Sequence, residues 1–430
     1  MGMKNLKSII AILLLVTVFA CSEKTTASFS IADPETINAV LDRYVEEGFY
    51  PFVYARLEDI EGNLIYEHAT VNQDLLPDVH IDGNTWIRVW SMSKIVTITI
   101  ALDLVEEGVL KLDDPVTKYI PEFDSLKVAV TTTGKSLTEL EWGNRNGTCP
   151  IKMVPHDSVM SVLHLINHQA GFYYATTDFP CLDSLLAAQN LPTAKNSQEL
   201  INRLAKLPLI QHAGTDYFYG TNTTVLGLVA ERATGKSLKQ LVEERVTNPL
   251  KIQGLQYGLP PNVQLLPRFT GQDSILRQAK KGELDIFGPD VPDYLPEHSL
   301  FLGGEGMLAT TDGYADFIRM LLKHGTLNNH RFLEEATVEN IYSPHTQLDS
   351  PYGYNGYNLW ISGDSLRIKE QGEAGLWIGG GYECTHFWAD PKRNFVGVIM
   401  SQNHGVRAPG YDLNDAFRGA VYKQIWESEK

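Results

Sequence analysis

The sequence lacks several residue patterns that would place it in a well-known class of protein. It contains only 4 cysteines in 430 residues, and they do not show the paired spacing of a zinc site. It has no His-Glu-x-x-His helix and no Gly-x-Ser-x-Gly elbow, so two common catalytic motifs are excluded. We therefore expect a protein that works without a metal ion or another cofactor.

Basic residues are scarce relative to acidic ones. The chain has 36 lysines and arginines against 52 aspartates and glutamates, which gives a formal net charge of -16. Such a surface repels phosphate backbones, so nucleic acid is not an expected partner. At 43% hydrophobic and 20% charged residues, the composition is that of an ordinary globular protein. The length allows one large two-lobed domain or two ordinary domains.

The N-terminal apolar run, from Ser8 to Ala20, is too short for a membrane span, which takes about 20 apolar residues. Two lysines precede the run and Cys21 follows it, a pattern that resembles a bacterial lipoprotein signal with its lipobox. In such signals the cysteine is lipidated and becomes the mature N-terminus. We therefore expect a protein of the bacterial cell envelope, held by lipid at Cys21 in the periplasm or at the outer membrane. The predicted parts are a signal peptide at 1–20, a tether at 21–31 and one folded domain at 32–430.

Export would place the remaining cysteines in an oxidising compartment. Cys149 and Cys181 could then form a disulfide, although the sequence leaves open whether they pair or stay reduced. Cys384 lies in a stretch that reads as a strand, where a buried and unreactive thiol is the usual outcome.

Hydrophobic periodicity predicts strands near both ends of the chain and helices between them. The two ends would then meet in one α/β lobe, while the middle, roughly 125–345, would form a helical lobe. Active sites favour the cleft between such lobes. The predicted helices cover 32–47, 91–107, 158–167, 223–233, 313–324 and 413–427, and the predicted strands cover 52–57, 63–68 and the two segments that flank the turn 391–394.

Ser91 and Lys94 stand three residues apart at the head of an almost wholly apolar helix. Residues at this spacing are neighbours on one helix face, so the two side chains meet if Ser91 opens the helix. A serine hydroxyl needs a base to act as a nucleophile. Burial disfavours a charged lysine, which would make its amine a usable base, and a helix N-terminus favours a developing oxyanion. Alone the tetrad is weak evidence, because about one is expected by chance in a chain of this size.

Other segments accompany the tetrad and together resemble a known family. The segment IRVWSMSKIVTITIALDLVEEGVLKLDDPVTKYIPEF, at 87–123, resembles the serine β-lactamase-related family of class C β-lactamases, D-Ala-D-Ala carboxypeptidases and family VIII esterases. The resemblance implies an α/β (α+β) fold of the β-lactamase/transpeptidase type, with an antiparallel sheet lobe flanked by helices, a mainly helical lobe and an active site in the cleft between them. Further matches are MSVLHLINHQAGF at 160–172, AGTDYFYGTNTTVLGLVAERATGKSL at 213–238, GGEGMLATTDGYADFIRML at 303–321 and GGGYECTHFWADP at 379–391.

The resemblance also implies roles for individual residues. Ser91 matches the acylated nucleophile and Lys94 its lysine partner. Tyr219 matches the tyrosine of the second family motif, Tyr-x-Asn, which acts as general base and acid. Thr221 stands where that motif has its asparagine, and Asn222 follows one residue late, so the donor to a substrate amide is expected at Asn222. A tyrosine here could instead belong to the core.

The third motif of the β-lactamases, Lys-Thr-Gly, does not occur in the sequence. Gly379, Gly380 and Gly381 stand in its place, as in the branches of the family that are not β-lactamases. Glycines there let a substrate carbonyl approach the strand edge, so the N–H of Tyr382 is expected to form an oxyanion hole with the N–H of Ser91. A glycine-rich turn that enters a hairpin is the alternative.

Two other features have simpler explanations. His164 and His168 lie four residues apart on a predicted helix, but no third metal ligand accompanies them, so structural roles are expected. The aromatic run at 172–174 could line the cleft or belong to the core.

These observations predict a lipid-anchored, metal-independent serine hydrolase that acts on small-molecule esters or amides, with a carboxylesterase as first choice because Lys-Thr-Gly is missing. A peptidase or β-lactamase of the same fold is the alternative. A binding protein of the cell envelope without turnover is a third hypothesis, and the intact Ser91, Lys94 and Tyr219 argue against it.

Overall fold

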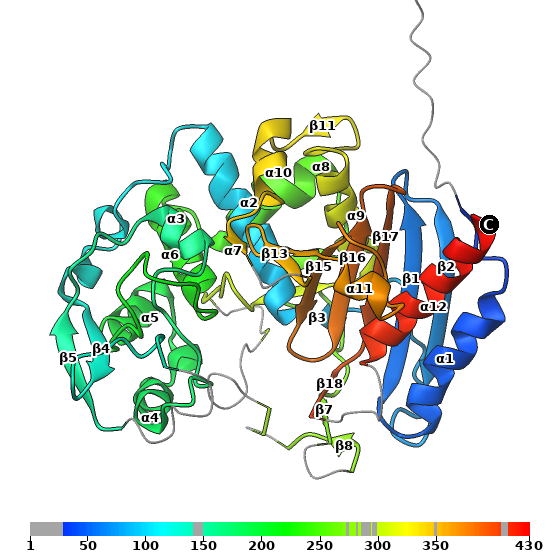
Figure 1. Cartoon of the computed structure of the whole chain (residues 1–430), viewed down its shortest axis with the longest axis horizontal. Coiled ribbons are helices and arrows are strands. Elements are labelled where there is room, and N and C mark those ends of the chain that lie inside the picture. The colour runs from blue at the N-terminus through cyan, green and yellow to red at the C-terminus, as the bar shows by residue number, and fades with distance from the viewer. Residues whose placement is uncertain are drawn as a thin grey trace, which may run out of the picture.

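The computed structural model describes residues 29–140, 149–271, 275–280, 283–284, 294, 299–347, 351–405 and 412–430. The predicted signal peptide, Cys21 and most of the predicted tether lie outside these ranges. No helix within them is long and apolar enough to cross a membrane. The described chain forms a sheet lobe and a mainly helical lobe side by side (Figure 1).

An eight-stranded antiparallel sheet forms the first lobe, in the order β12-β13-β14-β15-β16-β17-β1-β2. Strand β1, from the N-terminal part of the chain, pairs with β17, from the C-terminal part, and Ala55 lies opposite Ile399. This confirms the prediction that both ends of the chain meet in one lobe. The strands are β1 (Phe52–Asp59), β2 (Leu64–Val71), β12 (Thr346–Gln347), β13 (Gly353–Asn355), β14 (Trp360–Ser362), β15 (Trp377–Gly381), β16 (Thr385–Asp390) and β17 (Phe395–Met400).

Helices cover both faces of this sheet, because the residues of β1 alternate between two hydrophobic cores. Phe52 and Tyr54 belong to the larger core, which the sheet shares with the helical lobe, whereas Val53 and Leu57 belong to the smaller core. The smaller core lies under the two terminal helices, which run side by side on the outer face of the sheet (Figure 1). These helices are α1 (Pro34–Glu46) and α12 (Leu413–Ser428), and α9 (Thr311–Leu322) packs against β17 in the larger core.

Helix α2 (Ser93–Glu106) lies where the two lobes meet and packs against α6. Eleven of its 14 residues are buried, so it has almost no polar face and its lysine is buried with it. The other helices are α3 (Val162–Ile166), α4 (Pro180–Gln189), α5 (Ser197–Leu204), α6 (Asn222–Thr234), α7 (Leu238–Leu241), α8 (Asn248–Leu250), α10 (Glu335–Ile341) and α11 (Ser365–Ile368).

Four small sheets complete the described fold. Strand β4 (Lys127–Thr131) pairs with β5 (Ile151–Pro155) at the edge of the helical lobe, and β9 (Met307–Ala309) joins β3 (Ile87–Arg88) to β6 (Leu255–Tyr257) next to α2. In the third small sheet, β7 (Phe269–Thr270) lies between β8 (Arg277–Gln278) and β18 (Asn403–His404). The fourth small sheet pairs β10 (Thr326–Leu327) with β11 (His330–Arg331).

Cys149 and Cys181 form a disulfide, which settles the question that the sequence left open. The bond connects the start of the β5 segment to the first turn of α4. The helix predicted over 158–167 is shorter than expected, because Ser161 caps α3 at His164 N and the helical hydrogen bonds begin only after it.

Candidate active site

Ser91 lies in a tight turn just before α2 and not in the first turn of the helix itself. Trp90, Ser91 and Met92 form a short 3-10 turn, and α2 begins at Ser93. Trp90 has φ +46°, a left-handed conformation that costs a residue other than glycine about 1–3 kcal/mol. Its ring is buried and packs edge to face against Tyr382, with ring centroids 5.5 Å apart, so side-chain packing holds the turn in place.

Ser91 and Lys94 are in contact as expected, although Ser91 lies in the turn before the helix and does not open the helix itself. Lys94 Nζ donates to Ser91 Oγ at 3.0 Å. The lysine side chain is completely buried, and its Nζ also contacts Tyr174 OH at 2.9 Å, Gly304 O at 2.8 Å and Glu305 Oε1 at 3.4 Å. Four oxygen atoms therefore surround the nitrogen, which offsets the cost of removing a cation from water.

Glu305 is the residue of this site that the sequence analysis missed. It lies in the turn before β9 and is completely buried. Its Oε1 accepts a short hydrogen bond from Tyr174 OH, and its Oε2 accepts one from Thr224 Oγ1 at 2.6 Å. The only sequence signal was a glutamate flanked by glycines in an otherwise apolar stretch, which is unusual because a buried carboxylate needs a partner.

Tyr174 belongs to the aromatic run at 172–174, for which the sequence left open a place in the cleft or in the core. Its ring belongs to the core, and its hydroxyl belongs to the site. Its ring is buried, while its hydroxyl reaches Lys94 and Glu305. Burial and the neighbouring Glu305 carboxylate raise the pKa of Tyr174 well above its usual value. Tyr174 therefore stays a neutral phenol whose proton points to Glu305.

Tyr219 lies next to Tyr174, with ring centroids 5.8 Å apart, and lines the same cavity as Ser91. The residue is 40% exposed, and its ring centroid is 4.9 Å from Lys94 Nζ. Among the residues that the structure describes, its hydroxyl has no hydrogen-bond partner, whereas Tyr174 occupies the direct bond to the lysine. The structure thus places Tyr219 near Ser91 and Lys94, although no hydrogen bond among the described residues joins it to either.

His168 supports Tyr219 and is buried behind it. The two rings are stacked with centroids 4.8 Å apart, and His168 Nε2 lies 3.2 Å from Asn358 Oδ1. Burial, with a smaller effect of Lys94, lowers the pKa of His168 to about 3, so the imidazole is neutral at physiological pH. His164 lies in the capping box of α3. Within the described ranges no group of three His, Cys, Asp or Glu side chains is placed to hold a metal ion.

Asn222 does not have the position that its predicted role requires. It is completely buried at the start of α6, and its amide donates to Phe172 O at 3.2 Å and to Phe218 O at 3.3 Å. It is not among the residues that line the Ser91 cavity. The prediction that Asn222 contacts the substrate is therefore corrected: its side chain points into the helical lobe and fixes the loop before α6.

The glycine strand β15 reaches the nucleophile as expected. Within the described chain β14 pairs only with Trp377 and Ile378 of β15, so the backbone of the three following glycines has no strand partner on that side. A Cβ atom added to Gly381 would lie 2.4 Å from Val89 O, so only glycine lets this strand approach the turn that carries Ser91 so closely.

The expected oxyanion residues separate into two groups. Gly379 and Gly380 line the cavity together with Ser91, whereas Gly381 and Tyr382 do not. The Tyr382 ring packs against Trp90 and stacks on His404 with centroids 4.1 Å apart. Its side chain therefore supports the nucleophile turn.

The cavity at Ser91 has a volume of about 170 Å³. None of its described lining residues carries a charged side chain, so the site offers apolar and amide contacts and no ion pair. The lining residues are Ser91, Met92, Ile95, Tyr217, Tyr219, Asn355, Asn358, Trp360, Ile378, Gly379, Gly380 and Phe387.

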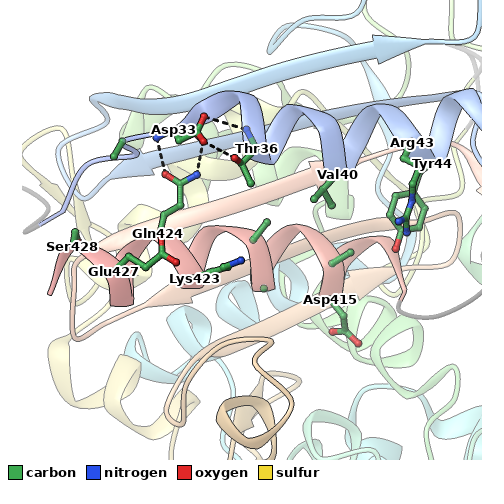
Figure 2. A pocket seen from close by; sticks show the side chains of 14 residues that line it. Asp33, Thr36, Val40, Arg43, Tyr44, Asp415, Lys423, Gln424, Glu427 and Ser428 are labelled. Atoms are coloured by element: carbon green, nitrogen blue, oxygen red, sulfur yellow. Dashed lines mark hydrogen bonds between the residues drawn. The ribbon is translucent and has the colours of Figure 1, made fainter. Parts of the chain in front are cut away.

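A larger hollow of about 760 Å³ lies far from this chemistry, between α1 and α12 on the outer face of the sheet (Figure 2). Asp33 N donates to Gln424 Oε1 at 2.9 Å and so ties the start of α1 to α12 at one end of the hollow. Val40 and the small residues of α12 line its middle. It contains no serine paired with a lysine, so the smaller cavity is the candidate active site.

Comparisons with known proteins agree with this geometry. A family model described as Beta-lactamase matches residues 60–418. Protein Rv1367c of Mycobacterium tuberculosis is 27% identical over 86% of this chain and 88% of its own length. The lovastatin esterase of Penicillium rubens is 25% identical over 86% of this chain and 94% of its own.

Solved structures show the same fold. EstCE1, described as a hydrolase with promiscuous acyltransferase activity, superposes with a TM-score of 0.70 at 18% identity. The match covers 90% of this chain and 98% of that protein. The predicted β-lactamase/transpeptidase-like fold is therefore confirmed.

Proposed function

Because this chain belongs to the Beta-lactamase family, we propose that it is a serine hydrolase that cleaves uncharged carboxylic esters through an acyl-enzyme on Ser91. One observation carries this proposal: Ser91 Oγ lies 3.0 Å from the buried Lys94 Nζ and faces a cavity. A serine in this setting is an activated nucleophile.

Acylation would begin when Ser91 Oγ attacks the ester carbonyl. Tyr219 is the proposed base, because it lines the cavity and its hydroxyl is not held by another described residue. Tyr174 is a poor candidate, since burial raises its pKa and its proton is bonded to Glu305. The proton taken from Ser91 would then pass to the alcohol that leaves, and water would release the acyl group in a second cycle.

The developing oxyanion needs donors on the far side of the carbonyl. The proposed donors are the backbone N–H of Ser91 and an N–H at the end of the glycine strand, for which Tyr382 remains the prediction. Support comes from the open edge of β15, which follows Trp377 and Ile378 and lies beside Ser91. Preorganised backbone donors of this kind cost no reorganisation during the reaction.

The choice of an ester rests on the absence of charge. β-Lactamases and carboxypeptidases act on substrates with a carboxylate, and the family motif that binds it is replaced here by Gly379, Gly380 and Gly381. No described residue that lines the cavity supplies another cation. The names of the relatives point the same way, since one is a lovastatin esterase and the other is described as a hydrolase with acyltransferase activity.

We also propose that lipid at Cys21 anchors the protein in the bacterial cell envelope. Support comes from the sequence alone, with two lysines, the apolar run 8–20 and a cysteine after Ala20. The anchor would leave the folded domain, with its disulfide between Cys149 and Cys181, in an oxidising compartment.

A parallel assay tests the proposed function. The soluble form that lacks residues 1–21 is incubated with short-chain aryl esters, a chromogenic cephalosporin and a D-Ala-D-Ala peptide. We expect turnover of the esters and little or none of the other two. Turnover of the cephalosporin or the peptide alone would replace the esterase by the alternative function, and no turnover of any of the three would contradict the proposal.

A further inference from the structure

We propose that Glu305 is a positioning residue that holds Lys94 as an ammonium, so that Lys94 acts on Ser91 as a hydrogen-bond donor and not as the base. The inference rests on the proposed function, because it concerns how the Ser91 site works. It replaces the expectation from the sequence that burial would turn the lysine into a neutral amine.

Charge compensation favours the ammonium form of Lys94. Lys94 and Glu305 are both completely buried, and their charged atoms are 3.4 Å apart. A single ion in such a place is strongly disfavoured, whereas a hydrogen-bonded pair of opposite charges is tolerated. The carboxylate thus favours the charged form of the lysine.

The hydrogen bonds around Glu305 are donated to its carboxylate by neighbouring hydroxyls. Thr224 Oγ1 accepts from Gly304 N at 3.2 Å, so its own proton is available for Glu305 Oε2 at 2.6 Å. The Tyr174 hydroxyl donates to the other carboxylate oxygen. Both oxygens of Glu305 therefore accept protons from hydroxyls, as an ionised carboxylate does.

The short contacts of Lys94 Nζ are all with oxygen atoms that can accept hydrogen bonds. Gly304 O, at 2.8 Å, can only accept. Tyr174 OH, at 2.9 Å, uses its proton in the hydrogen bond to Glu305 and must therefore accept from Lys94 as well. Ser91 Oγ, at 3.0 Å, is the third short contact. An ammonium has three protons, so all three contacts are satisfied and no lone pair remains for the Ser91 proton.

The proton from Ser91 must then go to another group. Two tyrosines are among the described lining residues, and burial raises the pKa of Tyr217 above its usual value, so Tyr219 is the proposed acceptor. In the proposed step, ionised Tyr219 takes the Ser91 proton while the bond from Oγ to the carbonyl carbon forms. Tyr219 then gives the proton to the alcohol oxygen as the bond from carbon to oxygen breaks. Lys94 keeps its three protons throughout and stabilises the serine oxygen.

The pH dependence of ester turnover can test the role of Glu305, because few of the described groups near Lys94 and Glu305 change their charge between about pH 6 and pH 9. Among the described residues, the titratable groups that face Lys94 or Glu305, besides each other, are Tyr174, Tyr219, His168, Tyr257 and Tyr294. Burial raises the pKa of Tyr174, Tyr257 and Tyr294 above the usual value for tyrosine. Burial lowers the pKa of His168 to about 3. Between about pH 6 and pH 9, all of these groups except Tyr219 stay neutral in every variant considered below.

The decisive variant is Glu305→Gln, which keeps the size of the side chain and removes its charge. Without the carboxylate, buried Lys94 gives up its proton at lower pH. We expect kcat/KM for an aryl ester to fall about tenfold near pH 6 and about a hundredfold near pH 9 relative to the wild type. A variant as fast as the wild type, or faster, at alkaline pH would show that neutral Lys94 is the base. A loss by the same factor at every pH would reduce Glu305 to a structural role.

Two matched variants separate charge from packing. Glu305→Asp keeps the charge with a shorter side chain, and Thr224→Val removes one hydroxyl donor while leaving both charges in place. Each is expected to keep the shape of the wild-type pH profile, whatever its amplitude. A selective alkaline loss in Glu305→Asp or Thr224→Val would contradict the role of the charge.

A spectroscopic measurement decides the question even if Glu305→Gln does not fold. In wild-type protein with 13C-labelled lysine, the Lys94 Cε signal, assigned with Lys94→Arg, should have the chemical shift of an ammonium at pH 8. The shift of a neutral amine would overturn the inference. If the wild type neither hydrolyses esters nor reacts at Ser91, the proposed function itself fails. If it does both and the Lys94 signal is that of an amine, only the role of Glu305 fails.

Discussion

The ring of Tyr219 stacks on the imidazole of His168, with their centroids 4.8 Å apart, while Lys94 Nζ lies 4.9 Å from the same tyrosine ring. The buried histidine cannot swing away, because Asn358 and Asn222 contact its two nitrogens. Tyr219 is thus held on a rigid surface beside Ser91 while part of its ring remains exposed to substrate.

This arrangement predicts the effect of Tyr219→Phe. The ring and its stacking remain, but the hydroxyl that would carry the proton is lost, so ester turnover should fall by at least about a hundredfold. Steady-state kinetics with an aryl ester measures the loss. The matched control is Tyr173→Phe, which removes a buried hydroxyl without a partner among the described residues and should leave kcat/KM nearly unchanged. Near-normal turnover by Tyr219→Phe would show that the base has been assigned wrongly.

The close approach of β15 to the nucleophile turn predicts the effect of Gly381→Ala. The added Cβ would lie 2.4 Å from Val89 O and 2.3 Å from Thr385 Oγ1, so the strand must shift away from Ser91. We expect kcat to fall about a hundredfold, as when an oxyanion donor is misplaced. Gly134→Ala is the control, because its φ is +89° and its Cβ would meet no atom within 4 Å. It should lower the melting temperature without changing kcat, and an equally small effect of Gly381→Ala on kcat would contradict the account.

The uncharged cavity predicts the order of substrates. Without a cation on the glycine strand, a substrate carboxylate loses a charged hydrogen bond of about 1.5–3 kcal/mol, whereas an uncharged ester loses nothing. We expect kcat/KM for a short-chain aryl ester to exceed that for a cephalosporin by at least about tenfold. Parallel progress curves with the two chromogenic substrates test this. Efficient hydrolysis of the cephalosporin would show that the substrate class is wrong.

The N-terminal pattern predicts where the protein resides. In bacterial cells, the wild type should fractionate with membranes, and globomycin should cause the precursor to accumulate. Cys21→Ser should prevent lipidation and release the folded domain. Immunoblots of membrane and soluble fractions show the outcome. Wild-type protein that is soluble in the cytosol with Met1 retained would refute the anchor.

The sequence predicted most of the fold, because the relevant signals are local. The short apolar run that begins at Phe52 and the turn at 391–394 indicate strands whatever their partners are. The spacing of Ser91 and Lys94 was equally informative, since three residues bring the two side chains together both in a helix and in the turn observed here.

The rest of the site depends on contacts between distant segments. Tyr174 is 80 residues from Lys94 and Glu305 is 211 residues from it, and no local pattern links them. The direction of Asn222 was equally inaccessible, because packing against Phe172 and Phe218 decides which way a residue at a helix start points. A buried glutamate between glycines was the one available hint.

The most direct test of the central claim is peptide mass spectrometry after reaction with a fluorophosphonate probe. Ser93, two residues from the predicted nucleophile, provides an internal comparison, because it is completely buried and its Oγ accepts from Met307 N at 3.1 Å. The account predicts a single adduct on Ser91, with no labelling and no ester turnover in Ser91→Ala. An adduct on Ser93, or labelling that persists in Ser91→Ala, would contradict it.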